Sequence, residues 1–168
     1  MKWLRNWWQR MRHDPEWLRR LLNLYPPYLG AGVRVRYIAP DFRRVTVEMP
    51  LRWYNRNYVG THFGGSLYSM VDLFYMLMLI HILGPEYVVW DQAAEIVFRR
   101  PGRGPVRAVF TLTDAQIEAI RRETASGRPY RPRFTVQITD PAGNVVAEVV
   151  KVLYVRRREV TDQSCGTY

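Results

Sequence analysis

Apolar and polar residues alternate at period two along much of the chain after residue 32, which is the pattern of half-buried β-strands. In "VRVRYI", Val33, Val35 and Tyr37 fall on one face and two arginines on the other. The stretch "VTVEM", residues 45–49, alternates in the same way, and "APDFRR" between the two contains residues typical of turns. The pattern therefore predicts a β-hairpin.

Four more stretches have strand character, and a helical stretch lies among them. The segment "TDAQIEAIRRE" begins with Thr113 and carries Gln116 three residues later, which is the capping-box pattern of a helix start. The sequence "DPAG" predicts a turn before the last strand. The four predicted strands are "AEIVFRRP", "VRAVFTLT", "RFTVQITD" and "VVAEVVKVLYVRR".

The stretch from Gly64 to Gly84, "GGSLYSMVDLFYMLMLIHILG", is apolar nearly all round. About twenty residues at ~1.5 Å each would span ~30 Å, so a transmembrane helix is one interpretation. Against it, Asp72 near the middle would cost roughly 2.5–3.5 kcal/mol on insertion scales, and the flanking strands need both helix ends on one body. We therefore expect an α+β fold with one long helix wrapped by a curved, mostly antiparallel sheet of five or six strands.

Residues 1–30 are predicted to form an N-terminal helical extension, followed by a main domain at 31–158 and a polar tail at 159–168. Trp and Leu recur at spacings of three and four between arginines, with a bend expected near Pro15. We favour an amphipathic helix packed on its own domain, with an interfacial membrane helix or a subunit contact as alternatives. The stretch lacks the apolar core and cleavage site of a secretory signal peptide.

Composition and charge narrow the function classes only slightly. With 168 residues and 48% hydrophobic content, the chain can bury one core. The single cysteine, Cys165, leaves no intrachain disulfide or cysteine-based metal site, so a reducing compartment is expected. The net charge of +10 comes mainly from arginine, which suits phosphate or carboxylate binding. A solvated basic surface is the simpler explanation, and the arginines match no nucleic-acid-binding motif.

The loop before the central helix, "NYVGTHFGGSLYSMVD", resembles a motif of phenylacetate-type thioesterases. That motif is Asn-x-x-Gly-Thr-x-His-Gly-Gly, followed seven residues later by Asp. The matching positions are Asn57, Gly60, Thr61, Gly64, Gly65 and Asp72. With "VVWDQAAEIVFRRP" and "VVKVLYVRR", the variant "FGGSLY" is more similar still to the uncharacterised DUF4442 group. The resemblance covers about residues 32–158 and implies the hotdog fold of acyl-CoA thioesterases and dehydratases.

The resemblance implies a thioester-hydrolysing site around Asp72. This carboxylate would activate water or attack the thioester itself, and Asn57 would orient the water or the carbonyl. Unpaired N–H groups near Gly65 and Ser66, at the helix start, would polarise the carbonyl, which is worth ~2.7–4 kcal/mol per donor in favourable cases. An aspartate buried among apolar residues also suits a general base. The alternative is a structural carboxylate, bonded to the backbone or to an arginine, that holds a dimer.

Further positions are expected to contact the substrate. Phe63 stands at the place of the motif histidine, and His62, one residue earlier, is interpreted as a loop histidine. Asp91 and Glu95 are four residues apart, so both would face one side of a regular strand. Arg99 and Arg100 would hold the phosphates of coenzyme A or lie in a solvated turn. The predicted substrate-binding set is Thr61, His62, Phe63, Gly64, Tyr68, Asp91, Arg99 and Arg100.

The expected function is hydrolysis of an acyl thioester carried by coenzyme A or by an acyl carrier protein. The expected assembly is a homodimer or tetramer with the site at the dimer interface. No cofactor is expected beyond the coenzyme A moiety, and no metal, because no histidine cluster joins the carboxylates. The expected location is the cytoplasm, with the N-terminal helix as a route to peripheral membrane contact. The rival functions are a non-catalytic acyl-thioester binder and a membrane-surface or nucleic-acid interaction module.

Overall fold

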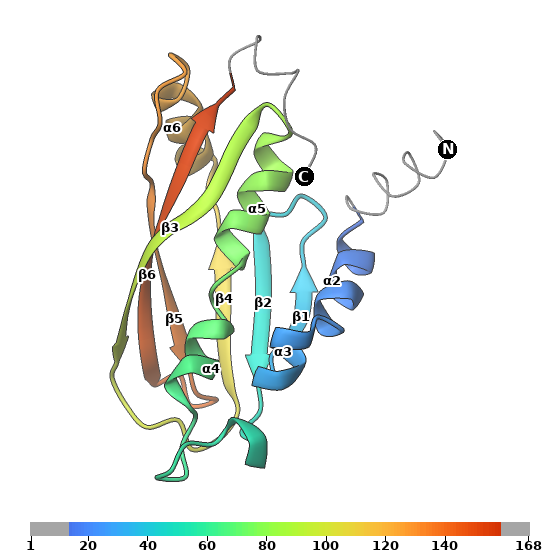
Figure 1. The fold of residues 1–168 in the computed structure, drawn as a ribbon, viewed down its shortest axis with the longest axis vertical. Helices are drawn as coiled ribbons and strands as arrows, with labels where there is room; N and C mark the ends of the chain where they lie inside the picture. Colours follow the sequence, from blue (N-terminus) through green and yellow to red (C-terminus); the bar gives the residue numbers. More distant parts are fainter. Residues whose placement is uncertain (1–13, 159–168) are drawn as a thin grey trace.

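A six-stranded sheet confirms the predicted α+β class in the computed structural model, which describes residues 14–158. The order across the sheet is β1-β2-β4-β5-β6-β3, and every neighbouring pair is antiparallel (Figure 1). β6 lies next to β5 and carries β3 on its outer side, so β3 forms one edge of the sheet. The strands are β1 (Arg34–Ile38), β2 (Arg44–Met49), β3 (Tyr87–Phe98), β4 (Val106–Thr111), β5 (Arg133–Thr139) and β6 (Val145–Arg157).

The predicted hairpin is present as β1 and β2, with one error in the assignment of faces. The register between the strands shifts between Val35 and Tyr37, which marks a β-bulge. Because a one-residue shift turns the following side chains to the other face, Tyr37 is 47% exposed and Ile38 is buried instead. The prediction that Tyr37 shares the buried face of Val35 is therefore wrong.

The predicted central helix is confirmed, but the structure interrupts it. It consists of α4 (Gly64–Ser69) and α5 (Phe74–Leu83), separated by residues 70–73. At the end of α4, the Val71 N–H donates to Tyr68 O, three residues earlier. This is the spacing of a 3₁₀ turn, whereas an α-helix bonds residues four apart. The Ser69 hydroxyl also donates to Gly65 O at 2.8 Å, and such back-bonding bends helices. The interruption places Asp72 in the connecting turn and not inside a continuous helix.

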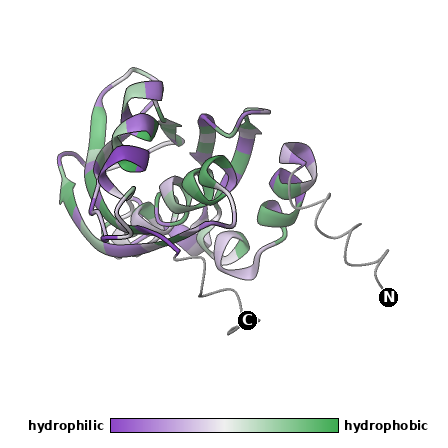
Figure 2. Ribbon diagram, turned by 90° about the horizontal axis from the view of Figure 1, so that it is seen from above, coloured by the Kyte–Doolittle hydropathy of each residue, from purple (hydrophilic) through white to green (hydrophobic). Residues whose placement is uncertain are grey.

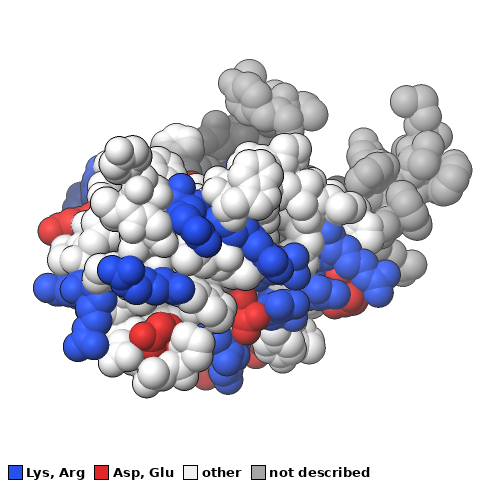
Figure 3. Space-filling view, turned by 90° about the horizontal axis from the view of Figure 1, so that it is seen from below, with Lys and Arg blue, Asp and Glu red and all other residues white. Residues whose placement is uncertain are grey.

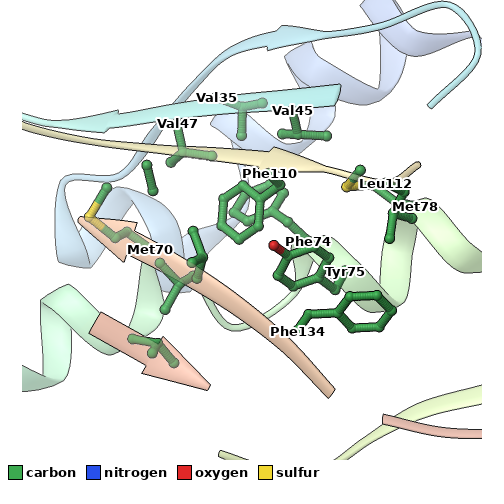
Figure 4. Close-up of a cluster of buried hydrophobic side chains, with 14 of the residues drawn as sticks. Val35, Val45, Val47, Met70, Phe74, Tyr75, Met78, Phe110, Leu112 and Phe134 are labelled. Atoms are coloured by element: carbon green, nitrogen blue, oxygen red, sulfur yellow. The ribbon is translucent and has the colours of Figure 1, made fainter. Parts of the chain in front are cut away.

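α5 lies inside the curve of the sheet and is hydrophobic on all sides (Figure 2). The segment Gly64–Leu83, which contains α4 and α5, has the length and hydropathy of a membrane span. Half of its most apolar stretch is nevertheless buried within this one chain. Phe74 and Tyr75 meet Phe110 of β4 at centroid distances of 5.0 and 5.2 Å, and Phe134 of β5 stacks on Tyr75 (Figure 4). These contacts are those of a core helix wrapped by a sheet.

Two short helices cover the opposite edge of the sheet, at β1. α2 (Pro15–Asn23) begins at the predicted bend, with Asp14 as its N-cap, and is followed by α3 (Pro26–Ala31). The Asn23 amide accepts from Val35 N at 2.8 Å and donates to Val35 O at 3.0 Å, which satisfies part of this edge. The described part of the extension thus packs on its own domain. The part of the predicted amphipathic stripe within residues 1–13 and the polar tail with Cys165 lie outside the described residues.

Two remaining elements complete the chain. α6 (Asp114–Glu123) has the predicted capping box, in which Thr113 and Gln116 bond each other's backbone N–H. η1 (Trp53–Asn55) is a 3₁₀ turn between β2 and α4. Asn55 of this turn is buried and donates to the carbonyls of Ala31 and Pro50 while accepting from Arg52 N.

Replacing Asn55 with alanine should lower the free energy of unfolding by about 1–3 kcal/mol. The change leaves the two carbonyls and one N–H in this buried region without their partner, and unsatisfied buried groups carry a cost of that order. Urea unfolding measures the change. Tyr58→Ala in the same loop is the matched control, because Tyr58 is fully exposed and its removal should alter stability by less than about 0.5 kcal/mol.

Candidate functional site

Asp72 meets a buried lysine at the interruption between α4 and α5. Lys151 Nζ lies 2.8 Å from Asp72 Oδ1 and donates a hydrogen bond to it. The Lys151 side chain is 0% exposed, whereas the Asp72 side chain is 50% exposed. The expectation of a buried Asp72 is therefore wrong for the single chain, because the carboxylate projects from a turn. One oxygen of the Asp72 carboxylate is therefore held by Lys151, while half of the side-chain surface remains open to solvent.

Asp91 of β3 is the second carboxylate at Lys151, with its Oδ1 3.1 Å from Nζ. The predicted alignment of Asp91 with Glu95 is wrong, because the register with β6 shifts between Asp91 and Ala93. Asp91 now pairs with Leu153 and lies on the face of Lys151, while Glu95 pairs with Val150 and faces the other way. The bulge thus directs Asp91 to the site and Glu95 away from it.

Tyr68 of α4 covers the ammonium from a third side. Its hydroxyl lies 3.4 Å from Lys151 Nζ, and the ammonium sits 5.3 Å from the ring centroid. Burial and the hydrogen bond with Asp72 raise the pKa of the Tyr68 hydroxyl. Tyr68, predicted as a substrate contact, therefore belongs to the same cluster as Asp72, Asp91 and Lys151.

The carboxylates of Asp72 and Asp91 and the ammonium of Lys151 each favour the charged form of their partner. Burial alone would lower the pKa of Lys151, but the hydrogen bond that it donates to Asp72 and the charge of Asp91 raise this pKa overall, so the amine is an ammonium. Burial raises the pKa of Asp91, and the charge of Lys151 acts in the opposite direction. The Asp91 Oδ1 atom is buried and makes its contact with Lys151 as an ion pair, without hydrogen-bond geometry. Asp72 is the more exposed carboxylate of this cluster.

Sequence reasoning missed Lys151, although the pattern contains a signal. Along β6, alternate residues Ala147, Val149, Leu153 and Val155 are buried, and Lys151 falls on the same face. A lysine on the apolar face of a strand is rare unless it is paired. Asp72 and Asp91 are its partners, and only the folded sheet brings these positions together.

Asn57, predicted to orient water, is occupied within its own loop. Its amide donates to Thr61 Oγ1 at 2.9 Å, and its oxygen accepts from Thr61 N at 2.9 Å and Val59 N at 3.2 Å. Thr61, which makes two of these bonds, is itself buried. In the single chain, both residues shape the loop that leads into α4, and neither presents a free group to the Asp72 cluster.

His62 is buried beneath the turn after β3, as expected for a loop histidine. The backbone N–H of His62 donates to Gly102 O, and its ring Nε2 lies 2.8 Å from Gly104 O. Burial lowers the pKa of His62, although the bond with Gly104 opposes this shift. The ring thus ties two loops together, and Phe63, not His62, borders the start of α4.

Acidification should destabilise the protein through His62. Because its pKa is lower when folded, the unfolded chain binds the proton first, so stability is present above about pH 6.5 and is lost as the pH falls below it. We expect the free energy of unfolding to fall between pH 7 and pH 5, and to fall less steeply in His62→Gln. Urea unfolding at several pH values measures both slopes; parallel slopes would contradict this role.

The start of α4 is formed by Gly64, Gly65 and Ser66, whose N–H groups precede the first intrahelical bond, from Leu67 N to Phe63 O. The Phe63 ring lies over Gly65, so a Cβ there would come within 2.4 Å of the ring. The Phe98 ring lies in the same way against Gly64. Both phenylalanines are more than half exposed, so the helix start is bordered by two accessible aromatic rings.

Arg99 and Arg100 follow β3 and are exposed. Arg99 donates to Glu148 at 3.3 Å and Arg100 to Asn144 at 3.1 Å, so each has a neutralising or polar neighbour but retains solvent access. Lys and Arg outnumber Asp and Glu on the face seen from below (Figure 3). Across residues 14–158, no three His, Cys, Asp or Glu side chains gather as a metal site would require.

Solved structures share this architecture. A protein of unknown function from Pseudomonas aeruginosa, described as a probable thioesterase, superposes with a TM-score of 0.77 at 23% identity, over 87% of this chain and 99% of that one. A protein from Chlorobaculum tepidum of unknown function gives a TM-score of 0.68 at 13% identity, over 86% and 97% of the two chains. A thioesterase from Haemophilus influenzae gives 0.64 at 15% identity, over 86% and 91%. These likenesses confirm the expected hotdog fold.

At the level of sequence, no curated protein matches the chain. The model of the family described as "Domain of unknown function (DUF4442)" matches residues 16–155. That range contains all the described strands except the last residues of β6, together with the Asp72, Asp91 and Lys151 cluster. The chain therefore belongs to the DUF4442 family.

Proposed function

We propose that this protein hydrolyses acyl thioesters at Asp72. The observation that carries the proposal is a half-exposed carboxylate anchored by a fully buried ammonium. A carboxylate with one fixed oxygen is oriented before the substrate arrives, which lowers the cost of reaching the transition state. The solved structures described as thioesterases share the fold and support the reaction class.

In the proposed reaction, Asp72 removes a proton from water while the water oxygen attacks the thioester carbonyl carbon. The carbonyl oxygen becomes an oxyanion, which the N–H groups of Gly65 and Ser66 would stabilise. The carbon–sulfur bond then breaks, and the proton held by Asp72 passes to the departing thiolate. In the variant of this scheme, Asp72 attacks the carbonyl carbon itself, the carbon–sulfur bond breaks and the thiolate leaves. Water then hydrolyses the resulting anhydride, which frees the carboxylic acid and restores Asp72, and the proton released by the water passes to the thiolate.

The proposed substrate is an acyl group carried by coenzyme A or by an acyl carrier protein. Arg99 and Arg100 are exposed cations at the end of β3, and coenzyme A phosphates or an acidic carrier would suit them. The aromatic rings of Phe63 and Phe98 border the helix start and offer an apolar surface to an acyl chain.

The proposed assembly is a homodimer formed along β3. This strand has twelve residues and forms an edge of the sheet. Eleven of these residues pair with β6, and the other side of β3 has no neighbouring strand among the described residues. Trp90 and Phe98 on it are more than half exposed. A long edge strand with exposed hydrophobic residues is unfavourable in a monomer and favours pairing with a second copy. Light scattering should give twice the mass of the chain.

A second candidate is an acyl-thioester binder without turnover, and Phe63 is the observation that favours it. Its side chain stands where related thioesterases carry a histidine, and its ring covers the Gly65 backbone in the single chain. The two candidates differ in a single assay. Wild-type protein incubated with short, medium, long and aromatic acyl-CoA substrates should release free thiol if it is a hydrolase. Micromolar binding without thiol release would favour the binder.

A further inference from the structure

Lys151 is the most unusual charge of the described chain. It lies on the core face of β6, between the buried side chains of Val149 and Leu153, and none of its surface reaches solvent. An isolated buried ammonium carries a high cost, which is lifted only by pairing and hydrogen bonding. A lysine at this position therefore requires partner groups that stay within contact distance of its ammonium.

Three oxygens surround the Lys151 ammonium, and they come from three different elements. They belong to Asp72 in the α4–α5 turn at 2.8 Å, Asp91 on β3 at 3.1 Å and Tyr68 on α4 at 3.4 Å. An ammonium has three N–H groups. Lys151 donates hydrogen bonds to Asp72 and Tyr68, pairs with Asp91 through charge and has no exposed surface, so a substrate does not reach it and any effect on chemistry must pass through its neighbours.

The two carboxylates differ in what they can reach. Asp91 is 23% exposed and has a buried oxygen, whereas Asp72 keeps half of its side-chain surface open. A purely structural ion pair does not require one partner to face solvent at a helix interruption. The open side of Asp72 is where water and substrate have access, while its other oxygen is held by Lys151.

We infer that Lys151 is a positioning residue that fixes one carboxylate oxygen of Asp72, with Asp91 as the counter-charge that keeps the ammonium in place. The catalytic part of this inference rests on the proposed hydrolysis, but the pairing itself does not. The Tyr28 hydroxyl also lies near both carboxylates; it is buried, burial raises its pKa, and it carries no charge in the neutral range.

The pairing can be tested without any assay of activity. The sequence contains only two lysines, Lys2 and Lys151, so protein labelled with ¹³C-lysine gives two side-chain Cε signals, assigned with a Lys2→Arg variant. We expect the Lys151 signal to remain that of an ammonium beyond the ordinary lysine range near pH 10.4. Asp72→Asn should move its titration to lower pH. A Lys151 titration that Asp72→Asn leaves unchanged would overturn the inference.

The catalytic consequence is tested by non-additivity. Asp72→Asn and Lys151→Met should each reduce kcat with KM changed less than about twofold, and the double variant should lose no more than Asp72→Asn alone. If Lys151→Met does not fold, Lys151→Arg replaces it; the retained charge should preserve part of kcat, although the planar guanidinium fits three converging oxygens less well. Fully additive losses would overturn the inference. A wild type without any turnover defeats the proposed function, while the lysine titration still decides the pairing.

Discussion

Replacing Lys151 with methionine is expected to lower the free energy of unfolding by about 3 kcal/mol at pH 7. The change removes the cation that faces Asp72 and Asp91 and leaves the more buried Asp91 without compensation. Breaking a buried ion pair from one side costs about 3–5 kcal/mol, and the exposed side of Asp72 places the expected loss at the lower end. Urea unfolding followed by fluorescence measures it.

The loss should depend on pH in a defined direction. Burial raises the pKa of Asp91, and without Lys151 nothing opposes that shift, so the folded variant binds a proton more tightly than its unfolded chain. The deficit of Lys151→Met should therefore shrink from pH 8 to pH 5. Arg107→Met is the matched control, because Arg107 is an exposed cation on β4, and it should cost less than about 0.5 kcal/mol. Equal losses in the two variants, or a deficit independent of pH, would contradict this account.

Asp72→Asn is expected to reduce kcat for thioester hydrolysis by about 10²–10⁴-fold. An amide cannot accept a proton from water or attack a thioester, yet it matches the carboxylate in shape and can still accept a bond from Lys151. The loss should therefore appear in kcat, with KM changed less than about twofold. Initial rates of thiol release measure it on the best acyl substrate.

Glu95→Gln is the control for this change. Glu95 lies on the same strand as Asp91, but the bulge in β3 turns it to the opposite face. Its neutralisation should leave kcat within about twofold of wild type. If both variants lost activity equally, the effect would arise from net charge and not from the position of Asp72.

Most of the fold could be predicted from the alternation of residues. The period-two segments correspond to strands, the apolar stretch after Gly64 to the central helix, and Thr113 with Gln116 to the cap of α6. The errors arise where pairing between strands overrides local pattern. Bulges near Tyr37 and after Asp91 shift the register by one residue, and such a shift is invisible in the sequence of one strand.

The candidate site could be predicted only in part. Asp72 was identified through its motif, but its setting depends on the interruption at residues 70–73, where Val71 bonds Tyr68 and the helix ends early. Lys151 lies 79 residues from Asp72 along the chain, so no local pattern relates them. The apolar face of β6 contained the relevant signal, since a lysine there requires a buried partner.

The N-terminal extension illustrates another limit. Its second half, α2, packs on β1 through Leu18 and Leu22, in agreement with the favoured interpretation. The Asn23 bonds to Val35 could not be foreseen, because the two residues lie 12 positions apart and meet only once α2 has docked on β1. Amphipathic spacing predicts which face of a helix is buried, and not which strand it covers.

The most direct test of the central claim compares thiol release by the full chain and by Asp72→Asn, side by side, across acyl-CoA substrates of increasing chain length. The account predicts that wild type releases thiol from at least one substrate well above the enzyme-free rate, and that Asp72→Asn falls to about that background. Turnover that persists unchanged in Asp72→Asn would contradict it.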